Sequence, residues 1–123
     1  MQTKKLKISE IYQLRNEISS LLPVKINHLF KTELIELFDR TASTIESVEK
    51  VRKELVTEHL GDIAPGTTEE VIQEMLGFPN FRKAFGELLD EEREIEYIPI
   101  KRKYLDFESD VVCPQIYKLV EKE

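Results

Sequence analysis

Residues 27–60 constrain the fold most, because this stretch contains neither glycine nor proline. Its apolar residues recur at steps of three or four, the periodicity of one face of an α-helix. They are Leu34, Phe38, Ala42, Ile45, Val48, Val51 and Leu55. Asn27 suits the N-cap, and Gly61 suits the left-handed residue that follows a helix. The sequence therefore predicts one helix of roughly 30 residues, about 45 Å long, with residues 41–44 as a place where hydroxyl groups could interrupt it.

Two short strands are expected near the two ends of the chain. Residues 5–8 alternate between polar and apolar side chains, and residues 94–100 are rich in β-branched and aromatic side chains up to Pro99. Opposite charges on facing strands contribute about 0.2–1 kcal/mol per pair. The charged residues that would face one another are Lys5, Lys7, Glu94 and Glu96. This complementarity predicts that the two strands pair.

Shorter helices are expected between these elements. Ser9 is the predicted N-cap of a helix that Pro23 ends, and Thr67 with Glu70 has the spacing of a capping box. Residues 81–89 carry an apolar stripe. Pro114 can occupy the first position of a terminal helical turn.

These elements predict a mostly helical α+β fold. A long central helix would pack with two or three shorter helices and with a two-stranded sheet that pairs the N-terminal and C-terminal strands. The 123 residues suit a single domain, 1–123.

Charge is distributed unevenly along the chain. With 18 Lys and Arg against 24 Asp and Glu, the net charge is -6. Residues 1–53 carry 10 basic and 7 acidic residues, whereas residues 54–123 carry 8 and 17. The acidic total argues against general electrostatic capture of nucleic acid or of an anionic membrane. No apolar run reaches the roughly 18 residues of a membrane span, and a single cysteine fits a reducing compartment, so we expect a soluble intracellular protein.

The residues that usually carry chemistry are too scattered to form a site. His28 and His59 would lie at opposite ends of the long helix, about 46 Å apart, too far to share a metal ion. Cys113 has no histidine near it in sequence to activate its thiol. The four glycines are not clustered, so no phosphate loop is expected. We therefore expect no catalytic residue, no cofactor and no metal site.

Three features are candidates for binding a partner. Phe78 stands beside Pro79 in a break between helices, and an aromatic side chain there could be an exposed anchor. An acidic run and a basic–aromatic cluster are the other two. The acidic run consists of Asp90, Glu91 and Glu92. The basic–aromatic cluster consists of Lys101, Arg102, Lys103 and Tyr104. The acidic run lacks the spacing of a calcium loop. The basic cluster could hold a phosphate or stack a base, or could be a loop anchored by Tyr104 and Phe107 with its cations in water.

The order of elements resembles that of a group of small uncharacterised bacteriophage accessory proteins. The residues that carry the resemblance are Leu6–Ile11, Ile45–Leu55 and Phe81–Glu96. The insert Gly77-Phe78-Pro79 and the triplet Lys101–Lys103 depart from it. The group has no catalytic residues to transfer. The resemblance implies a protein that acts in the cytoplasm of an infected bacterium or is packed with the virion.

The leading functional hypothesis is a non-enzymatic phage-encoded interaction protein that binds and modulates a host or phage protein. The first alternative is a structural or assembly component of the phage particle. In that role the chain could form a homo-oligomer. The second alternative is sequestration of a nucleotide by Lys101, Arg102, Lys103 and Tyr104.

Overall fold

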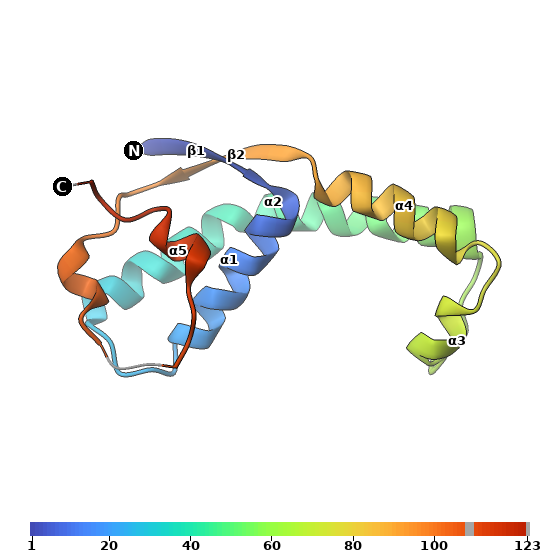
Figure 1. The fold of residues 1–123 in the computed structure, drawn as a ribbon, viewed down its shortest axis with the longest axis horizontal. Coiled ribbons are helices and arrows are strands. Elements are labelled where there is room, and N and C mark those ends of the chain that lie inside the picture. Colours follow the sequence, from blue (N-terminus) through green and yellow to red (C-terminus); the bar gives the residue numbers. More distant parts are fainter. Residues whose placement is uncertain (108–109, 123) are drawn as a thin grey trace. The chain divides into compact units, whose positions relative to one another are not determined.

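A computed structural model describes residues 1–107 and 110–122 of the chain (Figure 1). It confirms the predicted fold class: a mostly helical chain with one long helix, shorter helices and a small antiparallel sheet. The chain forms two compact units, residues 1–43 with 92–123 and residues 44–91. We call them the sheet unit and the acidic unit, and describe each by itself.

The long helix α2 spans His28–Leu60, as predicted. The Asn27 side chain caps its start by accepting a hydrogen bond from the Leu29 backbone N–H (2.8 Å). At its end Gly61 has a φ of 71°, and its N–H bonds to the Thr57 carbonyl (3.2 Å). The helix is continuous through residues 41–44. The Thr41 hydroxyl there donates back to the helix and accepts from Arg15 (2.8 Å), so it does not interrupt the backbone ladder.

The two strands pair antiparallel, as predicted. Strand β1 spans Gln2–Lys7 and β2 spans Glu92–Tyr97. The predicted complementarity is half right, because Lys5 lies opposite Glu94 whereas Glu96 lies opposite Thr3. Residue Ile8, expected in the strand, is instead the first residue of helix α1.

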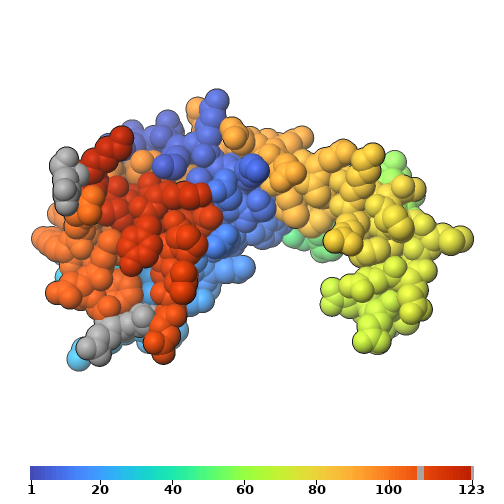
Figure 2. All heavy atoms as spheres, viewed as in Figure 1, coloured from blue at the N-terminus to red at the C-terminus, as the bar shows by residue number. Residues whose placement is uncertain are grey.

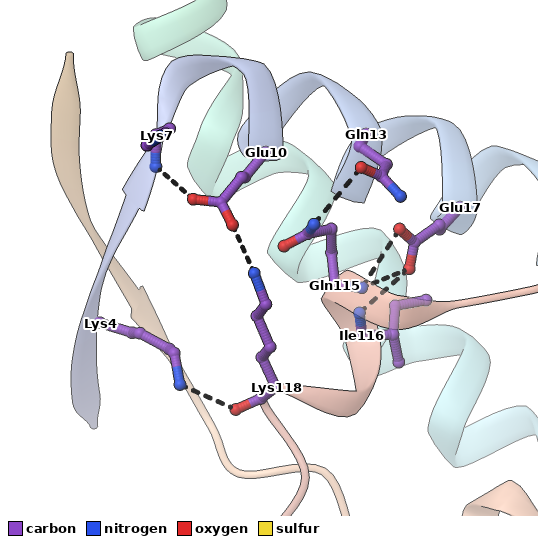
Figure 3. A network of polar contacts seen from close by, with 8 residues as sticks. All are labelled: Lys4, Lys7, Glu10, Gln13, Glu17, Gln115, Ile116 and Lys118. Atoms are coloured by element: carbon purple, nitrogen blue, oxygen red, sulfur yellow. Dashed lines mark hydrogen bonds and ion pairs between the residues drawn. The ribbon is translucent and has the colours of Figure 1, made fainter. Parts of the chain in front are cut away.

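The sheet unit holds the main hydrophobic core. Helix α1 (Ile8–Leu21) buries one face, and the short helix α5 (Pro114–Tyr117) packs against it. The fully buried apolar side chains include Ile8, Ile11, Leu14, Ile18, Leu21, Phe30 and Ile116. Beside them the carboxylate of Glu17 accepts hydrogen bonds from the backbone N–H groups of Gln115 (3.0 Å) and Ile116 (3.1 Å), as Figure 3 shows. A buried carboxylate thus satisfies donors at the start of α5.

Two predicted helix starts are displaced. Ser9 is not an N-cap: α1 begins at Ile8, and Glu10 reaches back to the backbone N–H of Lys7 (2.9 Å). Helix α3 spans Glu69–Gln73, and its cap is Thr68, one residue after the predicted Thr67. In both cases a neighbouring side chain reaches the free backbone donors, because several polar residues in succession can serve as caps.

Helix α4 spans Phe78–Leu89. It therefore includes Phe78 and Pro79, which were expected to lie in a break between helices. Pro79 lies in its first turn, where a missing N–H costs nothing. A short 3₁₀ helix, η1, spans Arg102–Leu105.

Candidate functional site

Helix α4 presents an aromatic ladder that is not enclosed by the acidic unit. Phe78, Phe81 and Phe85 follow one another along the helix, with ring centroids 6.2 Å apart for the first pair and 5.8 Å for the second. The second pair is nearly parallel, at 7°. All three rings are only half-buried, and neither α3 nor α4 contains a fully buried residue. An apolar stripe of this kind ordinarily faces a core, so the ladder is unusual in being only partly covered.

A hollow of about 600 Å³ lies along this ladder, between α4 and α3. Its apolar side is formed by Phe78, Phe81, Phe85 and Leu89, and its other side by Glu69 and Gln73 of α3. We call this surface the α3–α4 groove. Figure 2 shows the atoms of both helices at the molecular surface, in yellow-green and yellow.

Gly86 extends the α3–α4 groove across α4. It also lines a second hollow of about 490 Å³, together with Phe78 and Asp90. A Cβ at position 86 would meet nothing within 4 Å. The missing side chain therefore leaves open space at the surface of the helix.

Gly77 positions the start of α4. A Cβ placed on Gly77 would lie 1.7 Å from the backbone oxygen of His59, in the last turn of α2. Only a residue without a side chain permits this approach. The segment Gly77-Phe78-Pro79 thus brings α4 against the end of α2 and starts the aromatic ladder there.

The acidic run Asp90–Glu92 is exposed throughout. Asp90 is the C-cap residue of α4, whereas Glu92 begins β2 opposite Lys7. Among these predicted residues the structure brings Phe78 and Asp90 together, since both line the second hollow. Acidic residues at the end of a helix are unfavourable for its dipole, so the run does not serve to stabilise α4.

The basic cluster belongs to the sheet unit and surrounds a buried ring. Tyr104 is 4% exposed and stacks on Phe30, with centroids 5.6 Å apart. The ammonium groups of Lys101 and Lys103 lie 5.9 Å and 5.7 Å from its centroid, and the Arg102 backbone N–H bonds to Glu121 (3.2 Å). The stacking of a base on Tyr104 is incompatible with this burial. The loop is anchored by Tyr104 and Phe107, which both contact Phe30, with its three cations exposed.

A third hollow of about 650 Å³ lies beside β1 in the sheet unit. Two of its cations already have partners within the protein. Lys4 donates to the backbone oxygen of Lys118 (3.4 Å), and the Lys118 ammonium pairs with Glu10, as Figure 3 shows. Lys4 and Lys118 therefore connect β1, α1 and the end of α5 through these contacts.

Histidine and cysteine occupy structural positions. His28 begins α2 and His59 lies in its last turn. Cys113 is buried beside α5, and burial, aided by the nearby Glu17 carboxylate, raises the pKa of its thiol. A raised pKa disfavours the nucleophilic thiolate. Within residues 1–107 and 110–122, no three His, Cys, Asp or Glu side chains gather in a way that could hold a metal ion.

Glu33 is a partly buried carboxyl group near Lys101. Burial raises the pKa of its carboxyl, although Lys101 opposes the change. One of its oxygens has no hydrogen-bond partner among the described residues. The adjoining cavity holds only about 10 Å³, which is too small for anything larger than water.

Comparisons with protein-family models, with curated proteins and with solved structures find no match to this chain. Of the helices that the structure describes, none combines the length and the apolar character needed to cross a bilayer.

Sequence reasoning identified Phe78 but missed its neighbours as members of a site. Phe81, Phe85 and Leu89 have the spacing of a core stripe, and the pattern does not say whether another element covers them. Gly86 carried a usable signal, because a glycine inside a helix costs about 1 kcal/mol relative to alanine and so suggests a packing or binding reason.

Proposed function

We propose that this chain is a non-enzymatic, phage-encoded interaction protein that binds a host or phage protein and modulates it. The binding surface is the α3–α4 groove. The partner covers the aromatic ladder that the protein leaves open, and the sheet unit supplies the stable part of the fold.

The observation that carries the proposal is the incomplete burial of helix α4. This 12-residue amphipathic helix has no fully buried side chain. Apolar surface exposed to water costs roughly 25 cal/mol per Å², and burying it on association recovers that free energy. Leu76 and Val71, exposed by 100% and 52%, add apolar surface on α3 and the turn after it, outside the lining of the groove. Contiguous exposed apolar surface is typical of interaction sites.

The phage origin rests on the resemblance carried by Leu6–Ile11, Ile45–Leu55 and Phe81–Glu96. It directs the search for a partner to the proteins of an infected bacterium and of the particle. The third resembling segment includes most of α4, with Phe81 and Phe85 of the aromatic ladder, whereas Phe78 and α3 lie outside it.

The proposal is tested by affinity capture with variants that alter the α3–α4 groove. Gly86→Leu places a side chain where a Cβ meets nothing within 4 Å, and Phe81→Ser removes the middle ring of the ladder. Ser47→Leu is the matched control, because Ser47 is exposed on α2 and lines neither hollow. Each protein is tagged and incubated with lysate of infected bacteria, and the bound proteins are identified by mass spectrometry.

We expect the wild type and Ser47→Leu to recover the same stoichiometric partner and both groove variants to lose it. Circular dichroism establishes that each variant is folded. A partner that all four proteins retain equally would show that binding occurs elsewhere.

A further inference from the structure

The net charge of the chain resides entirely in the acidic unit. Residues 44–91 contain 11 Asp and Glu against 5 Lys and Arg, which gives -6, the value for the whole chain. Residues 1–43 and 92–123 contain 13 of each sign. The unit that carries the α3–α4 groove is thus strongly anionic, and the unit that carries the core is neutral.

Part of this charge lies on α3, the helix whose Glu69 lines the groove. Helix α3 has Glu69 and Glu70 in its first turn and Glu74 as its C-cap, and no basic residue. All three are exposed, and no cation among the described residues pairs with their side chains. On the far side of α4, Glu87 and Asp90 line the second hollow.

Arg82 and Lys83 are the two cations of α4, and the two hollows together contain three carboxylates, those of Glu69, Glu87 and Asp90. Both cations line the second hollow, and Arg82 also borders the α3–α4 groove. Glu69 and Arg82 thus line the α3–α4 groove with opposite charges, whereas Glu70 and Glu74 form no ion pair with any described residue. An apolar ladder beside an acidic helix that has no basic residue is complementary to a ligand with one apolar and one cationic face.

From this complementarity we propose that the occupant of the α3–α4 groove is a cationic amphipathic helix of another protein. This inference rests on the proposed function and adds the chemistry of the partner. The partner's apolar side chains, spaced at i, i+4 and i+7, lie on the aromatic ladder, and its Lys or Arg side chains face Glu69, Glu70 and Glu74. The 12 residues of α4 extend about 18 Å, which matches three turns of a partner helix.

The negative charge of the acidic unit also argues against two other possible occupants of the α3–α4 groove. A second copy of the chain would bring two acidic units together, and an anionic membrane surface would repel the same carboxylates. A basic helix gains both the burial of the ladder and the attraction of the glutamates.

The test uses two labelled helical peptides of about 18 residues with the same pattern of leucines at helical spacing. One carries lysine at every polar position and the other glutamate. Binding to the full chain is followed by fluorescence anisotropy at low and at high salt. We expect the Leu/Lys peptide to bind at least ~10-fold more tightly than the Leu/Glu peptide, with affinity that falls as salt rises.

Variants separate groove binding from general attraction to an acidic protein. Gly86→Leu and Phe81→Ser are expected to weaken the Leu/Lys peptide at least ~10-fold, whereas Ser47→Leu leaves it unchanged. The double variant Glu69→Gln with Glu74→Gln is expected to weaken it several-fold and to flatten its dependence on salt.

Three results would overturn the inference: equal binding of both peptides, Leu/Lys binding that the groove variants do not change, or a stable homo-oligomer in sedimentation that occupies the groove. If affinity capture still depends on Gly86 and Phe81 while the Leu/Lys peptide does not bind, the proposed function stands and only the cationic partner is wrong. If capture is also insensitive to both residues, the two proposals fail together.

Discussion

At the scale of single residues, two glycines of the acidic unit have opposite surroundings. Gly77 is in such close contact with the His59 backbone that a Cβ would overlap its oxygen, at 1.7 Å. Gly86, inside α4, has open space around it. Backbone atoms at the end of α2 cannot move aside as a flexible side chain could.

Alanine at each position therefore has opposite expected effects. Gly77→Ala should lower the free energy of unfolding by about 1–3 kcal/mol, the usual cost of overpacking. Gly86→Ala should raise it by roughly 0.5–1 kcal/mol, because alanine has the higher helix propensity. Denaturant unfolding followed by circular dichroism measures both. Equal stabilities for the two variants would contradict the packing described at Gly77.

The same two residues show what a sequence can and cannot reveal. A glycine two residues before a proline, at a break between helices, is expected to be part of a turn. That Gly77 is required by the approach of a backbone 18 positions earlier in the chain depends on tertiary packing, which local pattern does not encode.

At the scale of elements, a network of polar contacts holds α1, α5 and β1 together (Figure 3). Glu10 connects two of them, since its carboxylate accepts from Lys118 after α5 and from the backbone N–H of Lys7. These two hydrogen bonds lower the pKa of Glu10 below its ordinary value of 4.5.

The lowered pKa predicts a dependence of stability on pH. Ionised Glu10 stabilises the folded state above about pH 4.5, and this contribution is lost as the pH falls through the lowered pKa. Because the pair is partly exposed, we expect Glu10→Gln to cost under about 1 kcal/mol at pH 7 and nothing below the folded-state pKa. Denaturant unfolding of both proteins across this range measures the difference. A gap between them that persists at pH 2 would contradict this account.

Elements differ in how far the sequence determines them. The bounds of α2 were predictable, because Asn27, Gly61 and the uninterrupted stretch between them act locally. The pairing of β1 with β2 followed from charge and alternation, but its register did not, since several registers satisfy the same charges. The caps of α1 and α3 were displaced for the reason given above, that adjacent polar residues compete for the same donors.

At the scale of the whole molecule, the main hydrophobic core and the proposed binding surface lie in different units. The sheet unit buries the full apolar face of α1, and six residues of that helix are buried. Helix α4 has an equally regular apolar stripe and no residue buried to that degree. Hydrophobic periodicity predicted both helices. It could not distinguish them, because burial depends on what packs against each face.

This division is the central claim, and amide hydrogen exchange of the free protein tests it most directly. Residues that few apolar contacts hold in place open more readily than those in a packed core. We predict that the interior amides of α4 exchange at least ~100-fold faster than those of α1 at the same pH and temperature. Amides of α4 that exchange as slowly as those of α1 would contradict the account, because the aromatic ladder would then belong to a core and not to a surface that awaits a partner.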